Sequence, residues 1–336
     1  MNQIARSAVF IGFDSLCRAH GINPHQLLLD CGLDPLVLRH PDLYVPYARF
    51  AQALSLAAER GNCPDFGLRL SEHHDYLVLG PFGLLLSQAE SFREVLKLTQ
   101  QYVHLHAQGI ILTAQQDNQH LEVNYRLQLS ESVDLRQLLE LGLGVVHRSM
   151  RSLFGSQWQP LRISMRHACM GQPMEYCRFF GCPVLFEQSH DGIQASSNTF
   201  ELRPLEQRPQ LKSHLLEEYA HRHQVSTDLA SRVRLILQSI LPTGEARLEV
   251  VARLLEQHPR SLQYALQNQS LNFRQLLDEV RYNEARQQLQ LSNQSITDLA
   301  LHLGYADETA FSRAFKRWSG QAPRQWRQLN RAADKP

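Results

Sequence analysis

The feature that most constrains this chain is a repeat near its C-terminus. Two stretches, one around residues 250–273 and the other around residues 298–315, match when one is shifted by 48 or 49 residues. The aligned positions are small or apolar in both copies: Ala252 with Ala300, Leu262 with Phe311, and Leu266 with Phe315. Each copy predicts a short helix, a tight turn and a second helix. The region should therefore fold as an all-α domain with two helix-turn-helix units, at about residues 244–267 and 295–319.

The second copy has the clearer pattern. Gly304 follows the first helix, where a left-handed residue is expected, and Asp307 is placed to cap the next helix. Phe311, Phe315 and Trp318 share one helical face and should be buried. The opposite face carries hydrogen-bonding and basic side chains: Thr309, Ser312, Arg313, Lys316 and Arg317. A helix with one apolar face and one polar, basic face has the properties needed to enter a DNA major groove.

The first copy has a shorter recognition helix, expected over residues 259–267, with Arg260, Gln263 and Tyr264 facing outward. A further helix over residues 272–291 would join the two copies and would be roughly 27 Å long. With its flanking turns, it would hold the recognition helices about one DNA turn apart. A single such pattern is as often only a pair of packed helices. Two copies with basic outward faces at this separation favour a DNA-binding domain.

The charge distribution agrees with a polyanionic partner for the C-terminal segment. Residues 1–230 carry 19 basic and 23 acidic side chains, whereas residues 231–336 carry 15 basic and 10 acidic ones. This asymmetry suits DNA but is modest. No apolar run reaches the roughly 18 residues of a membrane span, and the N-terminus lacks the pattern of a signal peptide. We therefore expect a cytoplasmic protein whose six cysteines are reduced and mostly buried.

Residues 1–210 mix helix and strand patterns and predict an α+β domain. The expected helices cover residues 4–20, a long segment that begins at Pro46, a segment from a capping box at Ser91 to about residue 106, and residues 135–153. The expected strands cover residues 110–114 and 121–127 as a hairpin, then residues 161–167, 184–187 and 193–196. A linker helix over residues 211–230 would lead to the DNA-binding domain at residues 231–336.

The second repeat carries a long run of specific residues. It begins Ser295-Ile296-x-x-Leu299-Ala300-x-x-Leu303-Gly304-Tyr305-x-Asp307 and continues Phe311-x-Arg313-x-Phe315-Lys316-Arg317-Trp318-x-Gly320-x-x-Pro323. This run resembles the C-terminal signature of AraC/XylS transcription regulators, a highly specific motif, and the resemblance spans about residues 234–331.

The first half carries shorter runs. They are Leu79-Gly80-Pro81-Phe82-Gly83-Leu84-Leu85, Trp158-x-Pro160, Phe180-Gly181-Cys182-Pro183-Val184-x-Phe186 and Leu202-x-x-Pro204-Leu205. These runs are similar, less sharply, to the arabinose-binding-type effector domain of one AraC subgroup, the ornithine-utilisation regulator type.

The resemblance implies which side chains contact DNA. Base contacts would come from Arg260, Gln263 and Tyr264 in the first unit, and from Glu308, Thr309, Ser312 and Arg313 in the second. Phosphate contacts would come from Arg281, Lys316 and Arg317. Two positions depart from the family pattern, because Tyr264 stands where arginine is usual and Ser270 where glycine is usual. Tyr264 cannot make the two-pronged contact with guanine, so the base specificity of the first unit is left open while its fold is not.

The resemblance also implies that the N-terminal domain binds a small effector. The candidate pocket residues are Tyr102, His104, His106 and His167. The alternative for a histidine at a helix end is that it only satisfies last-turn carbonyl groups. Residues 79–85 are either core or pocket wall. His167-x-Cys169 with Cys177 and Cys182 matches no common zinc spacing, so no metal site is expected. Because no catalytic or phosphate-loop motif occurs, we expect neither an enzyme nor a cofactor.

Together these observations favour a sequence-specific DNA-binding transcription regulator, an effector-responsive activator of a catabolic or adaptive operon. Its expected partners are double-stranded promoter DNA, RNA polymerase and a small effector of the amino acid or organic acid class. A homodimer would raise its affinity for paired sites. The alternative is an accessory or architectural DNA-binding protein whose N-terminal domain only dimerises. An enzyme fused to a DNA-binding module has no support in the sequence.

Overall fold

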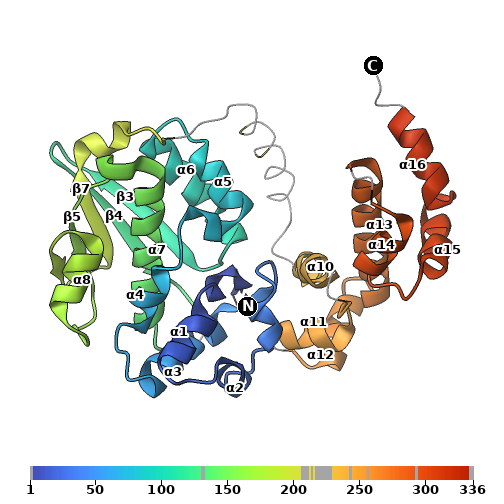
Figure 1. Cartoon of the computed structure of the whole chain (residues 1–336), viewed down its shortest axis with the longest axis horizontal. Coiled ribbons are helices and arrows are strands. Elements are labelled where there is room, and N and C mark those ends of the chain that lie inside the picture. Colours follow the sequence, from blue (N-terminus) through green and yellow to red (C-terminus); the bar gives the residue numbers. More distant parts are fainter. Residues whose placement is uncertain are drawn as a thin grey trace. The chain divides into compact units, whose positions relative to one another are not determined.

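The computed structural model describes residues 3–129, 133–205, 212, 215, 229–241, 244–255, 257–291 and 294–332. The chain divides into two compact units, Met1–Gln224 and Val225–Pro336, hereafter the N-terminal and C-terminal units (Figure 1). The predicted linker helix at residues 211–230 lies mostly outside the described residues. Within the described ranges, no helix combines the length and apolar composition that a membrane crossing needs.

The N-terminal unit is α+β, as predicted. Its α-helices are α1 (Phe13–Ala19), α2 (Pro24–Asp30), α3 (Tyr47–Arg60), α4 (Phe66–Ser71), α5 (Pro81–Ser87), α6 (Phe92–Tyr102), α7 (Arg136–Phe154) and α8 (Pro173–Phe180). Its strands are β1 (Ile4–Arg6), β2 (Tyr44–Pro46), β3 (Ile110–Gln116), β4 (His120–Leu127), β5 (Pro160–Ser164), β6 (Val184–Leu185) and β7 (Gly192–Ser196). Six short 3-10 turns are η1 (Ser7–Phe10), η2 (Pro35–Leu38), η3 (Tyr76–Leu79), η4 (Val103–Leu105), η5 (Gly155–Gln157) and η6 (Ser197–Glu201).

A five-stranded sheet forms the centre of this unit. Its order is β3-β4-β7-β5-β6, and all neighbours are antiparallel except β5 and β6. Strand β4 alternates, because Leu121, Val123, Tyr125 and Leu127 are buried while the residues between them are more exposed. Helix α7 packs over this apolar face (Figure 1). The predicted hairpin and the predicted helix over residues 135–153 are therefore confirmed.

The start of the chain differs from the predicted single helix over residues 4–20. Residues Ile4–Arg6 instead form β1, which pairs antiparallel with β2, and α1 begins only at Phe13. Gly12 precedes it with a φ of 83°, and a Cβ there would lie 2.4 Å from the ring of His73. The apolar spacing of this segment fits a helix locally. The pairing with β2 is non-local, and periodicity alone does not show it.

In the described residues of the C-terminal unit, every regular element is a helix, and short turns and loops connect the helices. Its helices are α10 (Leu229–Ile240), α11 (Leu248–Leu254), α12 (Pro259–Gln267), α13 (Phe273–Leu291), α14 (Ile296–His302), α15 (Glu308–Ser319) and α16 (Pro323–Ala332). The pairs α11–α12 and α14–α15 are the two predicted helix-turn-helix units, and α13 joins them. At 19 residues, α13 is about 28 Å long.

The second helix-turn-helix unit has most of the local structure that its sequence predicts, although Trp318 is half-buried and not buried as expected. Gly304 ends α14 with a φ of 73°, in the left-handed region. The Asp307 side chain accepts a 2.7 Å hydrogen bond from the backbone N–H of Ala310 and so caps α15. Phe311 and Phe315 are fully buried, which fixes the inward face of α15. The outward face of the helix is thereby determined as well.

Candidate functional site

Helix α12 presents the three predicted contact residues to solvent. Pro259 occupies its first turn, and Nδ1 of His258 accepts a 3.3 Å hydrogen bond from the backbone N–H of Arg260. Leu262 and Leu266 are fully buried beneath the helix. Arg260, Gln263 and Tyr264 are exposed, and Tyr264 keeps 67% of its surface open. An aromatic side chain this exposed is available for contact with a partner.

Helix α15 presents a second polar face. Thr309, Arg313 and Lys316 are exposed and Ser312 is half-buried, while the apolar residues between them face the core of the unit. Both recognition helices therefore have the division into a buried apolar side and an exposed hydrogen-bonding side that the repeat predicts. This division is what insertion into a major groove requires.

Two residues that were predicted as DNA contacts have hydrogen-bond partners inside the protein. The carboxylate of Glu308 accepts hydrogen bonds from Oγ1 of Thr297 at 2.7 Å and from Nη2 of Arg324 at 2.9 Å, which ties α15 to α14 and α16. Arg317 donates from Nη2 to Oδ2 of Asp278 on α13 at 3.1 Å. Both residues were predicted as DNA contacts because the family resemblance implies that role at their positions. Helix position alone does not show which partners lie on neighbouring helices.

Arg281, which was predicted as a phosphate contact, also has partners inside the protein. Its Nε donates to the carbonyl oxygen of Leu303 at 3.0 Å, and its Nη2 donates to that of Gly304 at 3.2 Å. Its guanidinium group lies over the ring of Tyr305, 4.5 Å from the ring centre. The last carbonyl groups of a helix lack partners within the helix. Arg281 therefore stabilises the end of α14 and the turn that leads to α15.

Ser270 follows α12 in a left-handed conformation, with a φ of 58°. This is the position where the family pattern has glycine. A residue with a Cβ is strained there, since left-handed backbone costs about 1–2 kcal/mol for residues other than glycine. Ser270 thus adopts, after α12, a backbone conformation that glycine would adopt without this strain.

An apolar cavity of about 100 Å³ lies in the N-terminal unit. Residues of α5, α6, α7, β3 and β4 line it, including Phe82, Val95, Leu112, Val123 and Val145. Leu79 lines it as well, so the stretch at residues 79–85 forms part of a pocket wall. Such mostly apolar cavities with a few polar groups are the usual form of small-molecule sites.

Of the four residues predicted for an effector pocket, only His106 lines this cavity. Tyr102 ends α6, where its hydroxyl accepts a 3.0 Å hydrogen bond from Nε2 of Gln101. His104 lies in the 3-10 turn η4, and His167 belongs to a different cluster described below. The prediction assumed one helix to residue 106, but α6 ends at Tyr102, and the turn that follows changes which side chains face inward.

Two buried polar atoms of the cavity lining have no hydrogen-bond partner within the described residues. They are Nδ1 of His106, a residue 6% exposed, and Oγ of Ser149, a residue 2% exposed. Burial lowers the pKa of His106 to about 3, so its imidazole is neutral at physiological pH. Sequence analysis missed Ser149, although Leu138, Leu141, Val145 and Ser149 form one helical stripe of α7.

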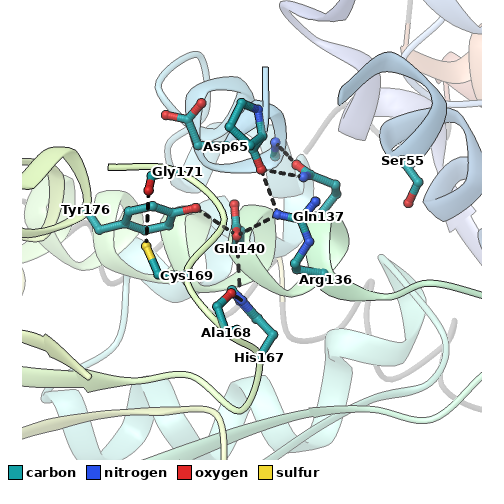
Figure 2. A network of polar contacts seen from close by, with 12 residues as sticks. Ser55, Asp65, Arg136, Gln137, Glu140, His167, Ala168, Cys169, Gly171 and Tyr176 are labelled. Carbon is teal, nitrogen blue, oxygen red and sulfur yellow. Dashed lines mark hydrogen bonds and ion pairs between the residues drawn. The ribbon is translucent and has the colours of Figure 1, made fainter. Parts of the chain in front are cut away.

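A separate polar cluster is centred on Glu140 of α7, whose side chain has no exposed surface (Figure 2). Its Oε1 accepts a 3.0 Å hydrogen bond from the hydroxyl of Tyr176. Nη1 of Arg136 lies 3.7 Å and Nε2 of His167 3.6 Å from the same oxygen, both too far for a hydrogen bond. Burial raises the pKa of Glu140 to about 8. Sequence analysis also missed this carboxyl group, because the spacing of apolar residues in α7 does not show that Glu140 is buried.

The six cysteines are free thiols, and most are buried, as expected. The buried ones are Cys17, Cys31, Cys63 and Cys182. Cys169 and Cys177 are half-buried. Within the part of the chain that the structure describes, no three His, Cys, Asp or Glu side chains are placed to hold a metal ion.

Comparison with known proteins covers both units. Residues 21–204 match the arabinose-binding domain of AraC transcription regulators, and residues 251–329 match a helix-turn-helix domain. The HTH-type transcriptional regulator VirS of Mycobacterium tuberculosis is 27% identical over 331 residues, 97% of each chain. The ornithine utilization regulator of Pseudomonas aeruginosa is 24% identical over 321 residues, 93% of each chain. The crystal structure of the transcriptional regulator CdpR from Pseudomonas aeruginosa is 22% identical, with a TM-score of 0.43 over 91% of this chain and 96% of that one.

Proposed function

This chain belongs to the AraC family of transcription regulators, and on that premise we propose that it activates a catabolic or adaptive operon in response to a small effector. Its helix-turn-helix units make it a DNA-binding transcription regulator. In the proposal, the cavity of the N-terminal unit takes the effector, and the C-terminal unit holds promoter DNA beside RNA polymerase. The protein would act in the cytoplasm and would not be an enzyme.

One observation carries the proposal. Each recognition helix has an exposed polar face above a fully buried apolar one, and both helices belong to a single compact unit joined by α13. One such helix pair is common in helical cores, but here both second helices leave basic or amide side chains exposed, namely Arg260, Gln263 and Arg313. The length of α13 supports a separation of about one turn of DNA between the two helices.

We propose specific contacts on this basis. Arg260, Gln263 and Tyr264 would meet bases in one major groove, and Thr309, Ser312 and Arg313 would meet them in the next. Arginine and glutamine can each form two-pronged contacts with a base edge, whereas Tyr264 offers its ring to a thymine methyl group. Lys316, exposed on α15, would contact a phosphate.

Hydroxyl-radical footprinting of the full chain on the DNA upstream of neighbouring operons tests the proposal. We expect two protected backbone segments, one beside each contacted major groove, centred about one turn apart. Transcription by RNA polymerase from the same template should rise when the protein is added. Binding with a steep salt dependence but no preferred site would contradict sequence-specific regulation. Protection without any change in transcription would favour an accessory DNA-binding protein instead.

A further inference from the structure

We propose that the cavity of the N-terminal unit binds a small, uncharged and mostly apolar ligand whose one hydrogen-bonding group is held by His106 and Ser149. The ligand would be about the size of a single six-membered ring. This inference rests on the proposed function, since it names the chemical class of the effector, and it departs from the amino acid or organic acid expected from the sequence.

The lining of the cavity disfavours a charged ligand. Among the described residues that line it, none is Asp, Glu, Lys or Arg. Arg6, whose charge acts on His106, already binds the carboxylate of Asp42 and the carbonyl oxygen of Val78. A carboxylate or an ammonium group would therefore leave water without gaining a counter-charge. An amino acid would bring both groups, which makes it the least suitable of these classes.

The same lining disfavours a sugar. Four of its polar side chains are already engaged: Tyr47 and Tyr125 with each other, His74 with the carbonyl oxygen of Ile11 at 2.9 Å, and Thr99 with the carbonyl oxygen of Val95 at 2.7 Å. Among the lining residues that the structure describes, His106 and Ser149 each have a buried side-chain atom without a partner, Nδ1 and Oγ respectively. Each hydroxyl of a pentose needs a partner, and most would be buried unpaired here.

The two unpartnered groups suit a neutral polar group. Because His106 is neutral, its ring has one N–H donor and one acceptor nitrogen. The hydroxyl of Ser149 can donate or accept. Buried polar atoms in proteins almost always have a partner, so a ligand hydroxyl or carbonyl group that reaches these side chains would complete the site.

The size of the cavity limits the ligand. Its volume of about 100 Å³ is somewhat below the roughly 150 Å³ of an engineered apolar cavity that binds benzene. Leu96, Ile110, Leu112 and Val146 line it and are only half-buried. A ligand would cover apolar surface on these side chains, and that burial supplies the favourable free energy of binding.

Calorimetry and thermal unfolding of the full chain near pH 7 test the inference with five probes. Phenol and toluene have nearly the same shape and differ in the hydroxyl group. Benzoate carries a negative charge, norvaline carries both charges, and L-arabinose is a pentose. We expect phenol to raise the melting temperature and to bind about 2- to 10-fold more tightly than toluene. Benzoate, norvaline and L-arabinose should bind far more weakly than either.

Two variants locate the binding and its polar contact. Val146→Phe fills the cavity and should abolish the binding of phenol, whereas Leu161→Phe enlarges an exposed strand residue outside the cavity and should not. Ser149→Ala should bring the affinity for phenol close to that for toluene. Equal phenol binding by the Val146→Phe variant and the unmodified protein would overturn the assignment. So would binding of benzoate, norvaline or L-arabinose with the affinity of phenol, or no binding of phenol and toluene at all.

The footprint separates this inference from the proposed function. Specific protection of DNA together with no binding of phenol or toluene would overturn the ligand class and leave the DNA-binding regulator intact. Phenol binding that the Val146→Phe variant loses, without any specific footprint, would support the ligand class and contradict the regulator. Phenol binding that leaves operator affinity unchanged would contradict an effector role for this class of ligand.

Discussion

The hydroxyl of Tyr176 donates a 3.0 Å hydrogen bond to the carboxyl group of Glu140, which is fully buried in α7. Burial raises the pKa of that carboxyl group to about 8, although Arg136 and the Tyr176 hydroxyl act in the opposite direction. The folded protein therefore holds Glu140 protonated at neutral pH, whereas the unfolded chain does not. This difference connects the stability of the N-terminal unit to pH.

Replacing Glu140 with glutamine should remove this dependence. Between the ordinary pKa of 4.5 and the folded value of about 8, unfolding releases a proton from Glu140. The unmodified protein thus loses stability as pH rises through this window, on the order of 5 kcal/mol in total. Glu140→Gln keeps an oxygen for Tyr176 but does not titrate. Its melting temperature relative to the unmodified protein should be higher at pH 8 than at pH 5, and a constant difference would contradict the raised pKa.

Replacing Ser270 with glycine should stabilise the C-terminal unit by about 1 kcal/mol. The φ of 58° at this residue is unfavourable for serine and favourable for glycine. Ser261→Gly is the matched control, because Ser261 lies within α12, where glycine costs about 1 kcal/mol. Chemical denaturation should show opposite signs for the two variants. Destabilisation by Ser270→Gly would mean that the serine side chain makes a contact that outweighs the backbone strain.

Replacing Arg281 with alanine should destabilise the C-terminal unit by about 1–3 kcal/mol, since two carbonyl oxygens lose a charged donor. The stability of the Arg281→Lys variant should lie between that of the unmodified protein and that of Arg281→Ala, because an ammonium group cannot reproduce both contacts of the guanidinium fork. Arg274→Ala removes an exposed arginine from the same helix and serves as the control. If Arg281→Ala left the free energy of unfolding unchanged but weakened DNA binding, Arg281 would act mainly as a phosphate contact.

Replacing Arg313 with alanine should cost about 1–3 kcal/mol of binding free energy at the specific site and much less on random DNA. Arg313 is exposed on α15, and its loss should leave the melting temperature nearly unchanged. Arg178→Ala removes the same charge from α8 of the N-terminal unit, where 71% of the side chain is exposed, and should not alter binding. Fluorescence anisotropy at one fixed salt concentration measures the binding of both variants to specific and to random DNA. Equal losses on specific and random DNA would identify Arg313 as a phosphate contact.

Features set by neighbouring residues could be predicted from the sequence. Asp307 caps α15 and Gly304 ends α14 because capping and left-handed turns depend on a few adjacent residues. The outward faces of α12 and α15 follow from the spacing of Leu262, Leu266 and Phe311, which are buried. The whole arrangement of exposed side chains on the recognition helices is of this local kind.

Features that depend on distant segments could not be predicted in the same way. The pairing of β1 with β2 replaces the first turn of a predicted helix. Arg281 donates hydrogen bonds to the carbonyl oxygens of Leu303 and Gly304, which lie more than 20 residues further along the chain. The cavity collects side chains from α5, α6, α7, β3 and β4, and only His106 among the predicted residues is one of them. Periodicity shows which side of a helix is apolar, but not where two apolar sides leave space between them.

The two exposed faces of the C-terminal unit are chemically unlike. One holds an arginine, a glutamine and a tyrosine on α12, and the other a threonine, a serine and an arginine on α15. A single molecule carries these two faces in a fixed order along its chain, so the DNA site that it occupies is asymmetric and has a direction. Turning that stretch around within a promoter would reverse the orientation of the bound molecule relative to the transcription start. Genomic searches for its targets should therefore keep track of strand, and should not assume palindromes.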